Sequence, residues 1–145
     1  MSLRNGSSIV APATIPATIA SAESPTKLPG TADETADLVR AAGRRALAVG
    51  LDVRDEEAIA RLADRVFAEF GRCDLLINNA AVSPPGPTLG AGTRRWRLAV
   101  DVNLNGVFWC NRAFGKHMLG RKRGAIVNIG SMSAIIVNKP QKQAY

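Results

Sequence analysis

The chain has 145 residues and a mass of 15.4 kDa, enough for about one domain, and its 46% hydrophobic and 21% charged residues are typical of a folded protein. No apolar stretch approaches the roughly 18 residues of a membrane helix, so we expect no membrane partner. The formal charge of +7 does not indicate a nucleic-acid partner, because residues 1–101 carry twelve basic and twelve acidic side chains, only 5% of the residues are aromatic, and no nucleic-acid-binding motif is present.

The first thirty residues differ in composition from the rest of the chain. They contain four of the eight prolines together with many Ser, Thr and Ala residues, and they lack helical or alternating periodicity. Proline fixes φ and removes a backbone donor, so residues 1–30 are predicted to be a low-complexity, disordered arm in front of a domain at 31–145.

A secretory signal peptide is the alternative for this segment. Arg4 precedes a moderately apolar stretch, and Ala20-Ser21-Ala22 is similar to a cleavage site. Two prolines interrupt the apolar stretch, however. We therefore expect a cytoplasmic protein with free thiols at Cys73 and Cys110.

From Thr31 onward the pattern becomes regular. Thr31 and Glu34 have the spacing of a capping box, which predicts a short helix that ends at Gly43. Residues 46–53 are rich in small and branched apolar residues, which predicts a buried strand that ends in Asp52. Apolar residues from Ile59 to Phe70 then recur at intervals of three and four and stop at Gly71, which predicts an amphipathic helix.

The second half continues the alternation of strands and helices. We predict a strand at 75–77, a Pro/Gly loop at 83–92, a long helix over about 93–119 and a strand at 125–129. Apolar strands that alternate with helices favour a parallel sheet covered by helices on both faces. Ligands bind at the carboxyl ends of the strands in such α/β folds.

The residues at these strand ends resemble the motifs of the short-chain dehydrogenase/reductase family. The resemblance spans about residues 31–145. It rests on Asp52-Val53, on Asn78-Asn79-Ala80-Ala81, on Val102-Asn103-Leu104-Asn105-Gly106-Val107-Phe108, on Ile126-Val127-Asn128-Ile129-Gly130-Ser131, and on Tyr145. Five motifs in this order imply a partial Rossmann-type, three-layer α/β/α fold with a parallel sheet.

The resemblance also implies a reaction and a set of site residues. Family members interconvert an alcohol and a carbonyl with NAD or NADP, and this chain does not reveal which of the two. The implied catalytic residues are Asn103, Ser131 and Tyr145. The implied cofactor-binding residues are Asp52, Val53, Asn78, Asn79, Ala80 and Ala81. Residues 131–141 resemble the substrate loop of members that act on polyols, sugars or sugar acids.

Two parts of the family pattern are missing. Nothing in residues 1–30 resembles the family's first strand and glycine-rich phosphate loop, and the family's lysine four residues after the tyrosine would lie beyond Tyr145. Gly86, Gly90 and Gly92 reproduce the glycine spacing at the wrong place, in a flexible connection. We therefore interpret the chain as a fragment that is weakly active or inactive.

Several of these residues have a structural alternative. Asn103 could bond a neighbouring backbone, and Asp52 could cap a helix, although Asp55 suits that role better. Ser133 could replace Ser131. The single histidine, His117, and the two separated cysteines give no metal-ligand spacing, so no metal is expected.

A second hypothesis is a non-catalytic interaction fragment. Family members commonly pair through the helix that corresponds to residues 93–119, and a homo-oligomer through this helix is the expected assembly. The leading hypothesis instead expects a small-molecule alcohol or carbonyl as the partner.

Overall fold

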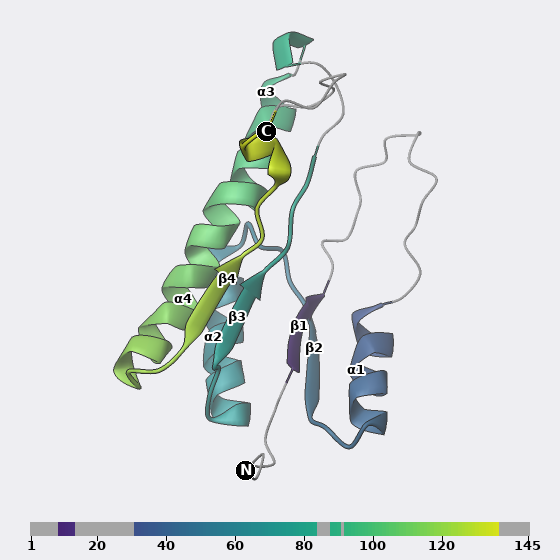
Figure 1. Ribbon diagram of the computed structural model, residues 1–145, viewed down its shortest axis with the longest axis vertical. Coiled ribbons are helices and arrows are strands. Elements are labelled where there is room, and N and C mark those ends of the chain that lie inside the picture. The colour runs from purple at the N-terminus through teal and green to yellow at the C-terminus, as the bar shows by residue number, and fades with distance from the viewer. Residues whose placement is uncertain (1–8, 14–30, 84–87, 91, 137–145) are drawn as a thin grey trace.

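The computed structural model describes residues 9–13, 31–83, 88–90 and 92–136, and Figure 1 shows their arrangement. Strands and helices alternate along most of this length, as predicted. The elements are β1 (Ile9–Ala13), α1 (Ala32–Ala41), β2 (Ala46–Gly50), α2 (Glu56–Phe70), β3 (Leu75–Asn78), α3 (Thr93–Val100), the π-helix η2 (Asp101–Asn105), α4 (Gly106–Gly120) and β4 (Ala125–Asn128), with short 3₁₀ turns at Thr88–Gly90 and Met132–Ala134.

The start of α1 confirms the predicted capping box. The Glu34 N–H donates to Thr31 Oγ1 over 3.1 Å, and the Thr31 N–H donates to Glu34 Oε2 over 2.9 Å. Two backbone donors that the helix itself cannot satisfy are thereby satisfied. The acidic Asp33 and Glu34 also lie at the positive end of the helix dipole.

Helix α2 begins and ends where the sequence indicates. Asp55 is its N-cap and accepts a hydrogen bond from the Ala58 N–H over 2.8 Å. Gly71 ends the helix with φ at 73°, a left-handed conformation that costs glycine little. The buried stripe consists of Ile59, Leu62, Ala63 and Val66.

The strands form two separate parallel pairs. β1 pairs with β2, and β3 pairs with β4 from Leu75 opposite Ala125 to Asn78 opposite Asn128. The sheet is parallel, as predicted. Within the described residues the strands form two pairs that are not hydrogen-bonded to each other.

The strand β1 differs from the disordered arm expected for residues 1–30. Ile9–Ala13 run parallel to β2, with Ile9 opposite Ala46 and Ala13 opposite Gly50. Pro12 lies within this strand and offers no backbone N–H to the ladder. The disorder prediction is wrong for these five residues, and the rest of residues 1–30 lies outside the described part.

Helices α2 and α4 pack together on one side of the strands, and α1 lies on the other side of β1 and β2 (Figure 1). The core joins Leu47, Leu51 and Val53 from β2 and its loop to Ile59 and Val66 of α2, and it includes Val102, Cys110 and Phe114 of the long helix. This arrangement makes three layers around β1 and β2.

Two sets of non-covalent side-chain contacts on the surface join α2 to α4. His117 of α4 stacks on Phe67 with ring centroids 4.1 Å apart, and its Nε2 lies 3.2 Å from Asp64 Oδ1. Arg112 of α4 pairs with Glu56 of α2 and also lies over the Trp109 ring. His117 and Trp109 therefore have packing roles.

Among the described residues, nothing covers the face of β3 and β4 that is turned away from α4. Ile77 and Val127 are 48% and 43% exposed, whereas Leu76, which points the other way, packs against the core. Successive side chains of a strand point to opposite faces, which explains the difference. The prediction of helices on both faces thus holds for β1–β2 but not for β3–β4 in the described residues.

The predicted long helix is continuous but contains a π-helical turn. The Gly106 N–H donates to the carbonyl of Asp101, five residues earlier, where an α-helix would use a carbonyl four residues earlier. This turn separates α3 from α4 and lies near the carboxyl end of the strands. No helix in the described ranges is long and apolar enough to cross a membrane.

Candidate active site

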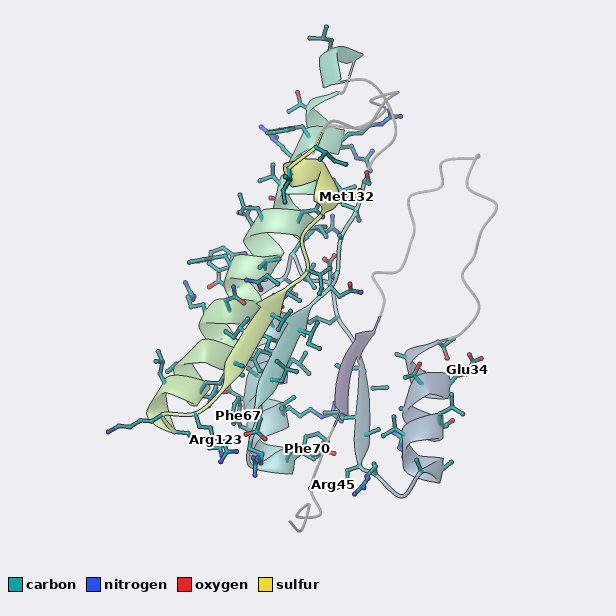
Figure 2. All side chains as sticks on the ribbon, viewed as in Figure 1. Glu34, Arg45, Phe67, Phe70, Arg123 and Met132 are labelled. Carbon is teal, nitrogen blue, oxygen red and sulfur yellow. The ribbon has the colours of Figure 1, made fainter. Side chains whose placement is uncertain are left out.

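The loops that follow β3 and β4 begin side by side. The Ile129 N–H donates to the carbonyl of Asn78 over 2.9 Å, which extends the ladder one residue past the strands. Figure 2 shows Met132 at the carboxyl end of β4 and Arg123 at the opposite end. The segments that begin at Asn79 and at Ser131 therefore leave the sheet at the same edge.

Asn103 holds the loop after β3 through a pair of hydrogen bonds. Its Nδ2 donates to the carbonyl of Val82, and its Oδ1 accepts from the Val82 N–H, each over 2.8 Å. The amide side chain thus bonds to both backbone groups of one residue, as a neighbouring antiparallel strand would. The π-helical turn carries Asn103, and such turns are frequent at functional sites.

Asn78 uses its donor group for structure. Its Nδ2 donates to Oδ1 of Asn111 on α4 and to Oδ1 of Asn128 on β4, each over 2.7 Å. An asparagine amide has two N–H donors, so both are occupied and only its oxygen remains for another partner. This cluster joins β3, β4 and α4 directly below the strand ends.

Asp52 follows β2 and is paired with Arg54. The guanidinium Nε lies 2.9 Å from Asp52 Oδ1 and 3.0 Å from Oδ2, and the Arg54 backbone N–H donates to Oδ1 over 2.9 Å. The hydrogen bond from the Arg54 side chain lowers the pKa of Asp52 below its ordinary value. Asp52 is therefore ionised and does not cap α2, which Asp55 does.

Val53 joins this strand end to the long helix. A Cβ added to the buried Gly106 would lie 2.9 Å from the carbonyl oxygen of Val53 and 3.0 Å from its Cγ2. Glycine is therefore required for the close approach of α4 to Val53. The contact places Asp52-Val53 next to the helix that carries Asn103.

The remaining predicted site residues lie at the same edge or outside the described part. Asn79, Ala80 and Ala81 are exposed in the loop between β3 and Val82. Ser131 is exposed after β4, and its carbonyl accepts a hydrogen bond from the Ala134 N–H over 3.1 Å. Ser133, the alternative to Ser131, lies in the following 3₁₀ turn. Tyr145 falls outside the described residues, as does Gly86 of the misplaced glycine pattern.

Sequence reasoning missed the residues that support this site. Arg54 had a visible signal, since an arginine two residues after an aspartate can bond its carboxylate locally. Gly106 had a weaker one, as a glycine within an otherwise apolar helix. Asn111 and Val82 had none, because their partners lie 33 and 21 residues away in the sequence.

No group of three or more His, Cys, Asp or Glu side chains among the described residues could hold a metal ion. Cys73 and Cys110 are both free thiols, as expected. Burial raises the pKa of Cys110 to about 11, which makes it a poor nucleophile.

Together, these features describe a partial Rossmann-type α/β fold with polar side chains at the carboxyl ends of its strands. Residues 18–145 match the family model described as short chain dehydrogenase. The chain belongs to this family.

Two relatives show the extent of the similarity. Galactitol 2-dehydrogenase from Rhizobium johnstonii is 48% identical over 94 residues, which are 63% of this chain and 36% of that protein. Cis-4-hydroxycyclohexanecarboxylate dehydrogenase from Sinomonas cyclohexanicum is 41% identical over 102 residues, which are 70% of this chain and 41% of that protein.

Solved structures agree with this assignment. The crystal structure of gox2181 is 37% identical with a TM-score of 0.72, and the match covers 77% of this chain and 43% of that chain. A metagenomic short-chain oxidoreductase in complex with NADP is 38% identical with a TM-score of 0.63, over 67% of this chain and 44% of that chain. The chain therefore spans less than half the length of these relatives.

Proposed function

We propose that this chain is part of an NAD(P)-dependent oxidoreductase that interconverts an alcohol and a carbonyl. The observation that carries the proposal is the gathering of Asn103, Asn79 and Ser131 at one edge of the strands. Small and hydrogen-bonding residues at this edge suit a site in which a substrate oxygen is held and a proton is moved.

The donors and acceptors at the end of β2 fit the adenine end of a dinucleotide. The ionised carboxylate of Asp52 can accept a hydrogen bond from the adenine amino group, and Val53 follows it along the chain. Asn79, Ala80 and Ala81 would line the adjoining part of the site. The N-terminus of α1 offers no phosphate site, because Thr31 and Glu34 already cap it.

Each proposed catalytic residue has a separate role at the substrate oxygen. A bound nicotinamide supplies or accepts a hydride. Ser131 would donate a hydrogen bond to the substrate oxygen, Asn103 would fix the loop after β3 and support a water-linked proton relay, and Tyr145 would exchange the proton. An ordinary tyrosine pKa is about 10, so work near pH 7 requires a shift of roughly 3 units, or about 4 kcal/mol.

We expect weak or no turnover by the 145-residue polypeptide. The lysine that would lower the tyrosine pKa in the family pattern has no counterpart within its sequence. For the substrate we propose a polyol, a sugar or a sugar acid. Support comes from the similarity of residues 18–145 to a family whose compared relatives include a galactitol dehydrogenase, and from the predicted substrate loop at 131–141.

Nucleotide binding and turnover test the proposal separately. NMR titrations of the chain with NAD⁺ and NADP⁺ should show binding, and Asp52→Ala should weaken it about tenfold. Asp37→Ala removes an exposed carboxylate of α1 and should leave the affinity unchanged. Absence of binding at millimolar nucleotide would contradict the cofactor proposal.

Turnover is assayed as NADH or NADPH oxidation with a panel of ketoses and sugar acids. We expect no more than trace rates. A robust rate that is lost in Tyr145→Phe would contradict the expectation of weak activity while supporting the assignment of Tyr145.

A non-catalytic association module is the second candidate, because the long helix exposes apolar side chains. Leu104 and Phe108 are 64% and 54% exposed and lie one turn apart. We propose that a homo-oligomer forms through this helix. Sedimentation velocity should show a dimer or larger species that Phe108→Glu dissociates. A monomeric wild-type chain at tens of micromolar would contradict this proposal.

The proposed compartment is the cytoplasm. Two free thiols, one of them buried, suit a reducing environment.

A further inference from the structure

The pair formed by Asp52 and Arg54 leaves one defined acceptor position at the end of β2. A carboxylate has about four acceptor positions. The Arg54 backbone N–H and Nε each lie 2.9 Å from Oδ1, and Nη2 lies 2.5 Å from Oδ2. Nε also lies 3.0 Å from Oδ2, so its one hydrogen is shared between the two oxygens. Three N–H hydrogens against four acceptor positions leave one position of the carboxylate for a further donor.

The surroundings hold Arg54 in this arrangement. Besides Asp52, the charge of Asp101 in the π-helix favours the charged guanidinium, and both carboxylates raise the pKa of Arg54. Asp101 itself accepts a hydrogen bond from Asn105 Nδ2 over 3.0 Å. Arg54 thus lies between the end of β2 and the helix that carries Asn103.

We propose that Arg54 is a positioning residue for nucleotide binding: its guanidinium holds the Asp52 carboxylate in one orientation and leaves the remaining acceptor position to the amino group of an adenine ring. This inference rests on the proposed cofactor site. The planar fork of arginine fixes a carboxylate in a way that the single ammonium of lysine does not. An adenine amino group donates to that position, whereas the carbonyl of hypoxanthine would meet a lone pair and be repelled.

Binding of 5′-AMP and 5′-IMP to the full chain, followed by NMR titration, tests this role. The wild type should bind AMP about tenfold more tightly than IMP. In Arg54→Ala the AMP affinity should fall about three- to tenfold and the ratio of the two affinities should approach one. Arg54→Lys should also lose the preference, because it keeps the charge without the fork.

A nucleotide-free measurement separates positioning from a general loss of structure. The ¹³C shift of the Asp52 carboxyl should titrate below the ordinary range in the wild type and at a higher pH in Arg54→Ala, because the guanidinium favours the ionised form. AMP binding should accordingly persist to lower pH in the wild type than in the variant. Arg54 is about half exposed, so its replacement is compatible with folding.

The matched control is Arg61→Ala, which removes an exposed arginine of α2 whose Nη1 lies 3.7 Å from Glu57 Oε2. It should change neither the AMP to IMP ratio nor the Asp52 titration. An unchanged ratio or an unchanged Asp52 titration in Arg54→Ala would overturn the inference and leave the cofactor site standing. A wild type that binds neither nucleotide would overturn both.

Discussion

At the scale of single residues, the observed role of Asn103 is to hold the loop that follows β3. Its two amide atoms are both bonded to Val82 over 2.8 Å, in the loop that leaves β3. One N–H and one lone pair remain for other partners. The side chain is therefore first a structural clamp between the π-helix and the loop, and any part in a proton relay is additional.

Replacement of Asn103 by Ala should destabilise the chain by about 1–2 kcal/mol, since two hydrogen bonds are lost. Urea denaturation measures the change, and faster hydrogen exchange of the Val82 amide should accompany it. Asn103→Asp keeps the acceptor but replaces the donor with a carboxylate oxygen that would face the Val82 carbonyl, so this variant should also lose stability. Asn105→Ala, which removes one bond to Asp101, is the control. Unchanged exchange at Val82 in Asn103→Ala would refute the clamp.

Cys110 should be the less reactive of the two thiols. Burial raises its pKa to about 11 from an ordinary value of 9.0, so at pH 8 roughly 100-fold less thiolate is present than for an ordinary cysteine. Alkylation followed by mass spectrometry should label Cys73 first in the native chain and both thiols equally in urea. Equal native rates would show that Cys110 is not protected.

At the scale of the elements, the approach of α4 to the end of β2 depends on Gly106. An added methyl group would overlap the Val53 carbonyl and its side chain. The Val53 backbone cannot move aside as a flexible side chain can, so α4 would have to move away from Val53. Such a shift would separate Asp52-Val53 from the helix that carries Asn103.

Gly106→Ala should therefore destabilise the chain by about 1–3 kcal/mol, the usual cost of overpacking. Gly115→Ala on the same helix is the matched control, because a Cβ there meets nothing within 4 Å. Alanine forms helices better than glycine, so the free energy of unfolding of the control should rise by up to about 1 kcal/mol. Thermal unfolding compares the two. A stabilised Gly106→Ala variant would show that the contact with Val53 is not tight.

The elements that were predictable from the sequence are those with local signals. The capping box at Thr31 and the glycine stop at Gly71 involve residues three or four positions apart, and the structure confirms both. The strand Ile9–Ala13 was missed, because its only support is pairing with β2 more than thirty residues later. The π-helical turn was missed because one additional residue in a turn barely changes the apolar pattern.

The site was predictable to a similar degree. The strand-end motifs located Asp52, Asn78–Ala81 and Ser131 at one edge of the strands. The partners of Asn78 and Asn103 could not be predicted, since they depend on contacts between distant segments. The proposed roles of the site residues stay predictions.

At the scale of the whole molecule, the described residues leave one face of β3 and β4 uncovered. Its apolar side chains are Leu75, Ile77, Val127 and Ile129, all of them exposed. An apolar strand surface of this kind favours association with other surfaces. The opposite face, which contains Leu76, contributes to the core.

Ile77→Thr should reduce binding of a hydrophobic dye and aggregation while it changes the free energy of unfolding by less than about 1 kcal/mol. Leu76→Thr changes the neighbouring residue on the opposite face. It should lower the free energy of unfolding by about 2–3 kcal/mol, because it places a hydroxyl against the core. Dye fluorescence and urea denaturation measure both variants. A larger loss of stability for Ile77→Thr than for Leu76→Thr would contradict this assignment of the faces.

The buried residues of the long helix have a consequence for anything that packs on it. Val102, Gly106, Cys110, Phe114 and Met118 are all buried and follow one another at intervals of four. Four residues exceed one α-helical turn by roughly 40°, so from Gly106 to Met118 the buried stripe winds by roughly 120° around the axis. At Gly106 it faces Val53, whereas at Met118 it lies against Gly124. The outward row that begins with Leu104 and Phe108 follows the same spiral, so a second helix seated along it would cross α4 obliquely, at an angle of about 50°.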